Sequence, residues 1–290
     1  MELRLLRYFT AVVQEGSITG AAQRLSVTQP TLSRQLMQLE EELDTELLDR
    51  SGRSVDLTQD GAMFYQRAME ILTLADKTEN EFKNRSELIE GMIAIGATEA
   101  GSSLVLPELV GSFTRKYPNV RYELYSGYTD DIRERIDKGL LDIGMLTQPV
   151  DVAKYAYVEL PQHDVWGILV RKDDPFAGRE SVSFREILDR KLMIPFRETV
   201  RRDIESWFKS PLDIFATYNL VSNAALLVEK GLATALSLSS IVRFVNMETL
   251  SFVPFEETKS VASVLIWKKN YMYSPTVTRF IQMISDIYKT

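Results

Sequence analysis

The chain has 290 residues, 45% of them apolar, which is enough to build the cores of two or more domains. It has no cysteine and one histidine, which excludes disulfide scaffolds and thiolate nucleophiles and leaves little to bind a metal, so no metal site is predicted. No apolar run approaches the roughly 18 residues of a membrane span, and the start MELRLLRYF lacks the order of a secretory signal. We therefore expect a cytoplasmic protein without membrane contact.

The charge is unevenly distributed along the chain. A net charge of −7 by itself argues against a nucleic-acid partner. Residues 1–58 carry six Lys or Arg and nine Asp or Glu, yet Arg24 and Arg34 are the only charged residues between positions 16 and 39. The acids gather at positions 40–46, so the segment 16–39 is locally basic on an acidic body.

Three helices are predicted in the first 43 residues. Apolar residues at helical spacing predict the first helix and end before Gly16: Leu3, Leu6, Phe9, Val12 and Val13. The second helix shows the spacing i, i+3, i+4 and i+7, with Ser17 and Thr19 available as caps: Ile18, Ala21, Ala22 and Leu25. After the break at positions 26–28, a third helix follows, with Pro30 near its start: Leu32, Leu36, Leu39 and Leu43. The last two form a predicted helix-turn-helix.

The third helix carries polar side chains away from its leucines. They are Thr28, Gln29, Thr31, Ser33, Arg34, Gln35 and Gln38. Arg and Gln can read guanine and adenine in the major groove through paired hydrogen bonds, and a helix N-terminus can meet a phosphate. The alternative is an ordinary solvated helix in a bundle.

Residues 47–58 then predict a strand, a glycine-containing turn and a second strand, a β-wing. Arg50 and Arg53 flank its tip and could reach the backbone or the minor groove, or be plain solvated charge.

Residues 3–58 resemble the winged helix-turn-helix of LysR-type transcriptional regulators. The resemblance rests on the ungapped run FTAVVQEGSITGAAQRLSVTQPTLSRQLMQLEEELDTELLDRSGRSVDLT. The family usually has Phe where Leu48 stands, a difference that touches packing. Together with the residue pattern, the resemblance implies DNA contacts from Thr28, Gln29, Pro30, Thr31, Ser33, Arg34, Gln38, Arg50 and Arg53.

Residues 59–90 predict one long helix because they contain no proline and a single internal glycine near the start. A heptad-like seam runs along it: Gly61, Phe64, Ala68, Ile71, Ala75, Thr78 and Phe82. The seam indicates a linker helix that pairs two copies of the chain. Two DNA-reading units related by two-fold symmetry are needed to span two half-sites of DNA. The alternative is a helix packed on its own domain. The family resemblance implies a dimer and, beyond it, a tetramer.

Residues 91–290 alternate short apolar strands with helices, which predicts an open α/β sheet. Strands are expected at 92–96, 120–125, 142–146, 165–171, 191–195, 214–221, 233–237 and 261–267. Helices are expected at 104–117, 129–138, 184–188, 199–209, 222–230 and 274–288. The order implies two lobes, 91–161 with 266–290 and 162–265. It is similar to the effector domain of LysR-type regulators, which itself resembles periplasmic solute-binding proteins.

Ligands of such sheets bind at the carboxyl ends of strands. The resemblance implies that a small-molecule effector binds between the lobes at Thr98, Glu99, Ser102, Ser103, Tyr128, Thr129, Thr147, Pro195, Phe196, Arg197, Thr199 and Asn219. Hydroxyls, helix N-termini and nearby arginines favour an anion. Glu99 stands where the family tends to have an uncharged residue, so the charge of the ligand stays open. Each Ser or Thr could instead be a helix cap.

No enzyme motif occurs in the chain. G-x-S-x-G, H-E-x-x-H and G-x-G-x-x-G are all missing, and His163 has no catalytic setting. Two further alternatives are a solute-binding receptor that serves a transporter and a helix-turn-helix used for protein contact. We expect a sequence-specific regulator, not an enzyme, with an α+β winged helix-turn-helix, a linker helix and a two-lobed α/β effector domain. Its expected partners are double-stranded promoter DNA, a second copy of itself and a small-molecule effector, without a further cofactor; RNA polymerase is a candidate partner.

Overall fold

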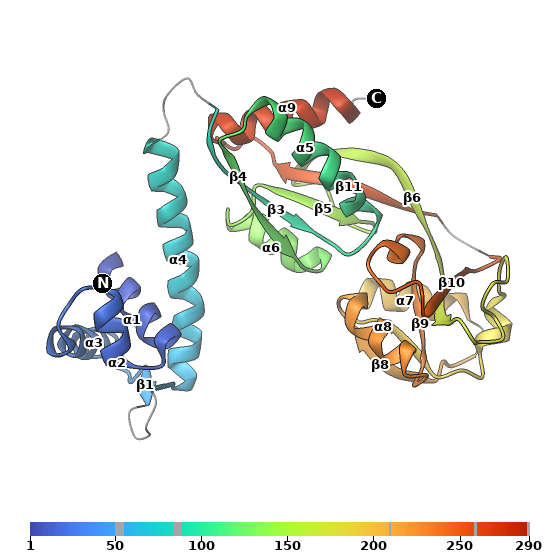
Figure 1. Cartoon of the computed structure of the whole chain (residues 1–290), viewed down its shortest axis with the longest axis horizontal. Coiled ribbons are helices and arrows are strands. Elements are labelled where there is room, and N and C mark those ends of the chain that lie inside the picture. Colours follow the sequence, from blue (N-terminus) through green and yellow to red (C-terminus); the bar gives the residue numbers. More distant parts are fainter. Residues whose placement is uncertain (50–54, 84–88, 209, 258–259, 289–290) are drawn as a thin grey trace. The chain divides into compact units, whose positions relative to one another are not determined.

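A computed structural model describes residues 1–49, 55–83, 89–208, 210–257 and 260–288. The chain forms two compact units, Met1–Arg85 and Ser86–Thr290 (Figure 1). No helix in the described ranges is both long enough and apolar enough to cross a bilayer.

The first unit is a winged helix-turn-helix with a long helix. Its elements are α1 (Leu3–Glu15), α2 (Ile18–Arg24), α3 (Gln29–Leu43), β1 (Leu48–Asp49), β2 (Asp56–Leu57) and α4 (Gln59–Lys83). The three predicted helices are confirmed. Gly16 ends α1 with a φ of 61°, a conformation that costs glycine little. The Ser17 hydroxyl, and not that of Thr19, caps α2 by accepting a hydrogen bond from the Gly20 N–H at 3.3 Å.

The core of this unit is built from the apolar faces of all three helices. Leu32, Leu36 and Leu39 of α3 are at most 1% exposed, and Phe9 and Val12 of α1 are fully buried. Leu43, expected in the same stripe, is 37% exposed because α3 ends there and Asp44 adopts a left-handed conformation. The two wing strands pair antiparallel, as predicted, and the tip between them lies outside the described residues.

Helix α4 packs one face on its own unit. Ala68 and Leu72 are buried with Leu6, and the Phe64 ring meets the Phe9 ring edge-on at 5.1 Å. The predicted seam is therefore wrong at Gly61, Phe64 and Ala68, which belong to the core of the winged unit; a Cβ on Gly61 would lie 1.9 Å from the Leu47 carbonyl oxygen. The side chain of Phe82 lies outside the described residues. Other apolar side chains of α4 stay exposed: Met63 at 64%, Ile71 at 38% and Leu74 at 37%.

The second unit is a two-lobed α/β domain, as predicted. Its first lobe is built from β3 (Gly91–Ala97), η1 (Gly101–Val105), α5 (Leu106–Lys116), β4 (Val120–Ser126), α6 (Thr129–Asp137), β5 (Ile143–Thr147) and α9 (Pro275–Tyr288). Its second lobe is built from η2 (Phe184–Ile187), β7 (Leu192–Pro195), α7 (Glu198–Trp207), β8 (Ile214–Tyr218), α8 (Val221–Glu229), β9 (Thr234–Leu238), η3 (Ser239–Arg243) and β10 (Leu250–Pro254). The lobes share β6 (Tyr155–Arg171) and β11 (Ser260–Lys268).

The strands run in the order β4-β3-β5-β11-β6-β9-β7-β8, and β10 pairs with β6. In Figure 1, α5 and α9 cover one face of the first lobe's sheet and α6 covers the other. One buried cluster of that lobe contains Phe113 and Phe280, and another contains Ile132 and Ile136. The second lobe has its own clusters, one around Trp166 and Ile204. Each lobe therefore has a core of its own.

Strand β6 differs most from the prediction. A strand was expected to start at Val165, but β6 spans 17 residues from Tyr155 and crosses from one lobe to the other (Figure 1). Pro161 lies in it at a register shift opposite Ser263, where a missing N–H costs no ladder bond. From Ser263 onward β11 pairs with β5, so the chain re-enters the first lobe three residues before the expected position 266. Strand β10 and helix η3 were not predicted.

Candidate functional site

The predicted reading helix α3 presents polar side chains to solvent. Gln29, Pro30, Arg34 and Gln38 are exposed, while Thr31 and Ser33 are half-buried. Among the described residues, Arg34 has no acidic partner, unlike Arg24, which pairs with Glu15 at 3.1 Å. The Arg34 guanidinium and the Gln29 amide, both exposed on the N-terminal half of α3, can form paired hydrogen bonds with base edges.

Two of the predicted DNA-contact residues also form hydrogen bonds that stabilise α3. The Thr28 hydroxyl caps α3 by accepting from the Thr31 N–H at 3.4 Å, and the two Oγ1 atoms lie 2.8 Å apart. Gln38 donates to Glu42 at 3.3 Å and accepts from Gln35 at 3.2 Å. Arg50 and Arg53 lie outside the described residues.

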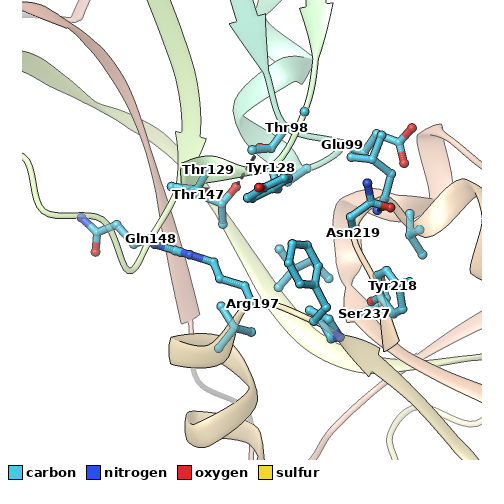
Figure 2. Close-up of a pocket in the computed structure, with 18 of the residues that line it drawn as sticks. Thr98, Glu99, Tyr128, Thr129, Thr147, Gln148, Arg197, Tyr218, Asn219 and Ser237 are labelled. Atoms are coloured by element: carbon cyan, nitrogen blue, oxygen red, sulfur yellow. Dashed lines mark hydrogen bonds between the residues drawn. The ribbon is translucent and has the colours of Figure 1, made fainter. Parts of the chain in front are cut away.

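A cleft lies between the two lobes of the second unit (Figure 2). It holds about 720 Å³ of free space, including its open mouth. From the first lobe the cleft is lined by the loops after β3, β4 and β5, and from the second lobe by the residues after β7 and β8. This is the strand-end position expected of an open α/β sheet.

The cleft brings together most of the predicted effector-site residues. Those that line it are Thr98, Glu99, Tyr128, Thr129, Thr147, Pro195, Phe196, Arg197 and Asn219. Three others do not. Ser102 is fully buried behind Thr98, with the two hydroxyl oxygens 3.0 Å apart; Ser103 bonds the Ala100 carbonyl; Thr199 is exposed on α7.

Sequence reasoning missed several lining residues, chiefly Gln148, Trp166, Tyr218 and Ser237. Gln148 and Tyr218 adjoin predicted strand ends, so the same rule could have found them. Trp166 lies on β6 and Ser237 lies on β9, and these two strands pair with each other. Only this pairing of distant strands brings both side chains to the cleft. Burial raises the pKa of the Tyr218 phenol, so it stays neutral and donates to the Leu236 carbonyl.

Contacts at three points join the lobes across the cleft. Arg197 of the second lobe donates to the Asp130 carboxylate and to the Pro149 carbonyl of the first. The Tyr128 and Phe196 rings meet edge-on at 5.0 Å. Glu99 accepts hydrogen bonds from the backbone N–H and the hydroxyl of Ser222 at the start of α8, both at 3.3 Å.

A buried carboxylate lies where β6 passes between the lobes. Asp164 is 3% exposed and accepts four hydrogen bonds: from the Gly101 N–H at 2.9 Å, the Ser239 hydroxyl at 2.9 Å, and the Ser240 N–H and hydroxyl at 2.8 and 3.0 Å. Gly101 belongs to the first lobe, whereas Ser239 and Ser240 belong to the second. Asp164 therefore ties both lobes to the crossing strand, and no sequence pattern had indicated it.

The described part of the chain holds no cluster of three or more His, Cys, Asp or Glu side chains that could bind a metal ion. The cleft offers a ligand hydrogen-bonding groups, aromatic side chains and the Glu99 carboxylate. It also contains the Arg197 guanidinium, which is already paired with Asp130.

Comparison with known proteins decides the family. The sequence profile of the LysR substrate binding domain matches residues 86–288, and that of the bacterial regulatory helix-turn-helix proteins of the lysR family matches residues 3–62. The chain belongs to the LysR family. It is a DNA-binding transcriptional regulator with a winged helix-turn-helix and a domain for a small-molecule effector, as the residues and the family resemblance had predicted.

Similar LysR-type regulators come from several bacteria. HTH-type transcriptional regulator YybE of Bacillus subtilis is 30% identical over 67% of this chain and 66% of its own length. HTH-type transcriptional regulator BenM of Acinetobacter baylyi is 29% identical over 99% of this chain and 96% of its own. The crystal structure of CbnR, a LysR family transcriptional regulator, covers both chains completely with a TM-score of 0.77 at 24% identity, so it supports the fold.

Proposed function

We propose that this LysR-type regulator reads promoter DNA with α3 in the major groove, in the cytoplasm, and that it catalyses no reaction. One observation carries the proposal: α3 buries Leu32, Leu36 and Leu39 and leaves Gln29 and Arg34 exposed at its N-terminal half. An ordinary bundle helix also has a polar face, but the family profile over residues 3–62 favours the reading role.

The proposed DNA face is narrow. Arg34 is the only charged side chain of α3 before Glu40, and the acidic residues follow at the far end of the helix. We therefore expect few phosphate contacts, weak non-specific affinity and a shallow dependence of affinity on salt.

Two copies are proposed to pair through α4, and pairs to form a tetramer. Met63, Ile71 and Leu74 are exposed on α4 although its other face is packed on the winged unit. Apolar side chains on a solvated helix face gain from burial against a second copy. The pairing would place two reading helices over half-sites separated by one or more turns of DNA.

The effector is proposed to bind in the cleft between the lobes. The three cross-lobe contacts and the nine predicted lining residues support this position. A ligand that binds the closed lobes more tightly than the open ones shifts the population of the two arrangements. The shift would change how the two winged units of the pair contact DNA.

The DNA-binding part of the proposal is tested by Arg34→Ala in the full-length protein. Fluorescence anisotropy with labelled promoter DNA should show a loss of about 1 to 3 kcal/mol in specific binding if Arg34 contacts a base. Arg24→Ala is the matched control, because Arg24 lies on α2 and is paired with Glu15. Unchanged operator affinity in Arg34→Ala would remove Arg34 from the interface. A helix-turn-helix used for protein contact would show no sequence preference in a salt titration.

A further inference from the structure

The two charged groups of the effector cleft differ in whether an opposite charge balances them. This difference indicates which class of ligand the proposed effector cleft would bind. Glu99 and Arg197 are the two charged side chains in the lining. The Arg197 Nε and Nη2 atoms donate to Asp130 at 3.0 and 3.3 Å, and Nη1 donates to the Pro149 carbonyl at 2.7 Å. Every nitrogen of this guanidinium is engaged, and its charge is balanced.

Glu99 has no such balance. Its two hydrogen bonds come from Ser222, one from a backbone N–H and one from a hydroxyl, and neither donor carries a full charge. It forms no ion pair with any described residue. A carboxylate has about four acceptor positions, so Glu99 keeps acceptor capacity for a further donor. The cleft therefore has one carboxylate that no described cationic side chain balances.

Carboxylates lie near the N-termini of the helices that begin at the cleft. Helix α6 has Asp130 and Asp131 in its first turn, and α7 has Glu198. Helix α8 has no acid in its first turn, but Glu99 reaches its Ser222 N–H from the other lobe. A helix N-terminus attracts an anion through its free N–H groups and its dipole. At α8 the Glu99 carboxylate already occupies this position, so the carboxylate of a ligand would have to compete with it there.

Aromatic side chains form much of the remaining wall. Tyr128, Trp166, Phe196 and Tyr218 line the same cavity, and Figure 2 shows Tyr128 of the first lobe and Tyr218 of the second on different walls of it. Aromatic faces attract an ammonium or quaternary nitrogen electrostatically. An aromatic wall with one unbalanced carboxylate is the chemistry that binds organic amines.

We propose that Glu99 determines the specificity of this cleft, and that the effector is an organic amine whose ammonium group pairs with the Glu99 carboxylate while its apolar part lies on the aromatic wall. The same carboxylate rejects ligands that carry a carboxylate. This inference rests on the proposed function, because it names the ligand class of the proposed effector cleft.

Matched probes in the full-length protein test the inference. Benzylamine is compared with benzoate, and cyclohexylamine with cyclohexanecarboxylate, by titration of the intrinsic fluorescence, to which Trp166 in the lining contributes. At least one amine should bind about tenfold or more tightly than its acid, and Glu99→Gln should reduce that ratio by about tenfold. Glu180→Gln is the control, because Glu180 is exposed in the second lobe, outside the lining and outside the helices that begin at the cleft.

Tighter binding of the acids, equal amine affinity in wild type and Glu99→Gln, or no binding of either amine would each overturn the inference. Thermal unfolding of both variants shows whether they are folded. Promoter binding, measured on the same samples, separates the two claims: loss of specific DNA binding by the wild type contradicts the proposed function, whereas failure of the amines with DNA binding intact contradicts only the assignment of the ligand.

Discussion

Arg197 in the second lobe and Asp130 in the first form a two-point ion pair across the effector cleft, at 3.0 and 3.3 Å. The Arg197 side chain is 13% exposed and the Asp130 side chain 50% exposed, so water screens the pair only from one side. Because Arg197 also lines the cleft, the pair joins the two lobes at the cleft wall. It links two residues 67 positions apart.

Arg197→Ala should loosen the closed arrangement of the lobes. We expect the free energy of unfolding to fall by about 1 to 2 kcal/mol, the range for hydrogen bonds to charged groups after allowance for the exposed side of Asp130. Arg202→Ala is the control, because Arg202 pairs with Glu198 on its own helix α7 and does not span the cleft. Urea denaturation measures both. Equal losses in the two variants would mean that the cross-lobe pair contributes no more than a surface pair.

Gly101→Ala should be strongly destabilising, since a Cβ there would lie 2.6 Å from the buried Asp164 Oδ2 and would disturb the hydrogen bonds of that carboxylate. A loss of about 2 kcal/mol or more is expected, the range for disturbing a buried, hydrogen-bonded charge. Gly111→Ala, in the middle of α5, has only the tip of Arg115 within 4 Å and should stabilise by up to about 1 kcal/mol. Thermal denaturation of the two alanine variants should therefore give shifts of opposite sign.

Thr28→Ala should weaken the reading helix from its end. The Thr28 hydroxyl caps α3, and loss of a cap typically costs about 1 kcal/mol. Thr28→Ser keeps the hydroxyl and should restore most of the stability of the winged unit. Circular dichroism during thermal unfolding gives the comparison. If serine and alanine behave alike, the methyl group rather than the cap is what matters at this position.

Paired glutamates on the exposed face of α4, Ile71→Glu with Leu74→Glu, should shift the protein toward smaller assemblies. The charges would be buried without partners if this face meets a second copy. Met37→Glu serves as the control, because Met37 is 49% exposed on α3, outside the proposed pairing face. Sedimentation velocity over a range of protein concentrations measures the mass. An unchanged mass in the double variant would place self-association on another surface.

Thr98→Leu should abolish the response to the effector while leaving DNA binding intact. The Thr98 hydroxyl faces Thr147 at 3.4 Å on the cleft wall, and a larger apolar side chain would fill the space. Thr199→Leu is matched in chemistry and lies outside the lining. Promoter binding with and without an extract of small metabolites reports the response. A normal response from Thr98→Leu would put the effector elsewhere.

Local pattern was sufficient for much of this molecule. The bounds of α1, α2 and α3 follow from apolar spacing, from Gly16 and from the capping hydroxyls, all of which act within a few residues. Nine of the nineteen residues that line the cleft were also predicted, from the family resemblance together with the rule that ligands of open α/β sheets bind at the carboxyl ends of strands. The winged fold and the two-lobed domain were therefore determined by the sequence itself.

Only the tertiary structure decided which surfaces are used and which charges are balanced. Strand β6 continues through Pro161 because its pairing with β11 shifts register at that point. The paired residues of β11 lie about 100 positions away in the sequence, so local pattern could not show this. The first half of α4 is packed on α1, and its periodicity could not tell that contact from pairing with a second copy. Arg197 is neutralised by Asp130, and Glu99 meets Ser222 123 positions away. Periodicity and capping are local, whereas ion pairs and strand pairing depend on how distant segments pack.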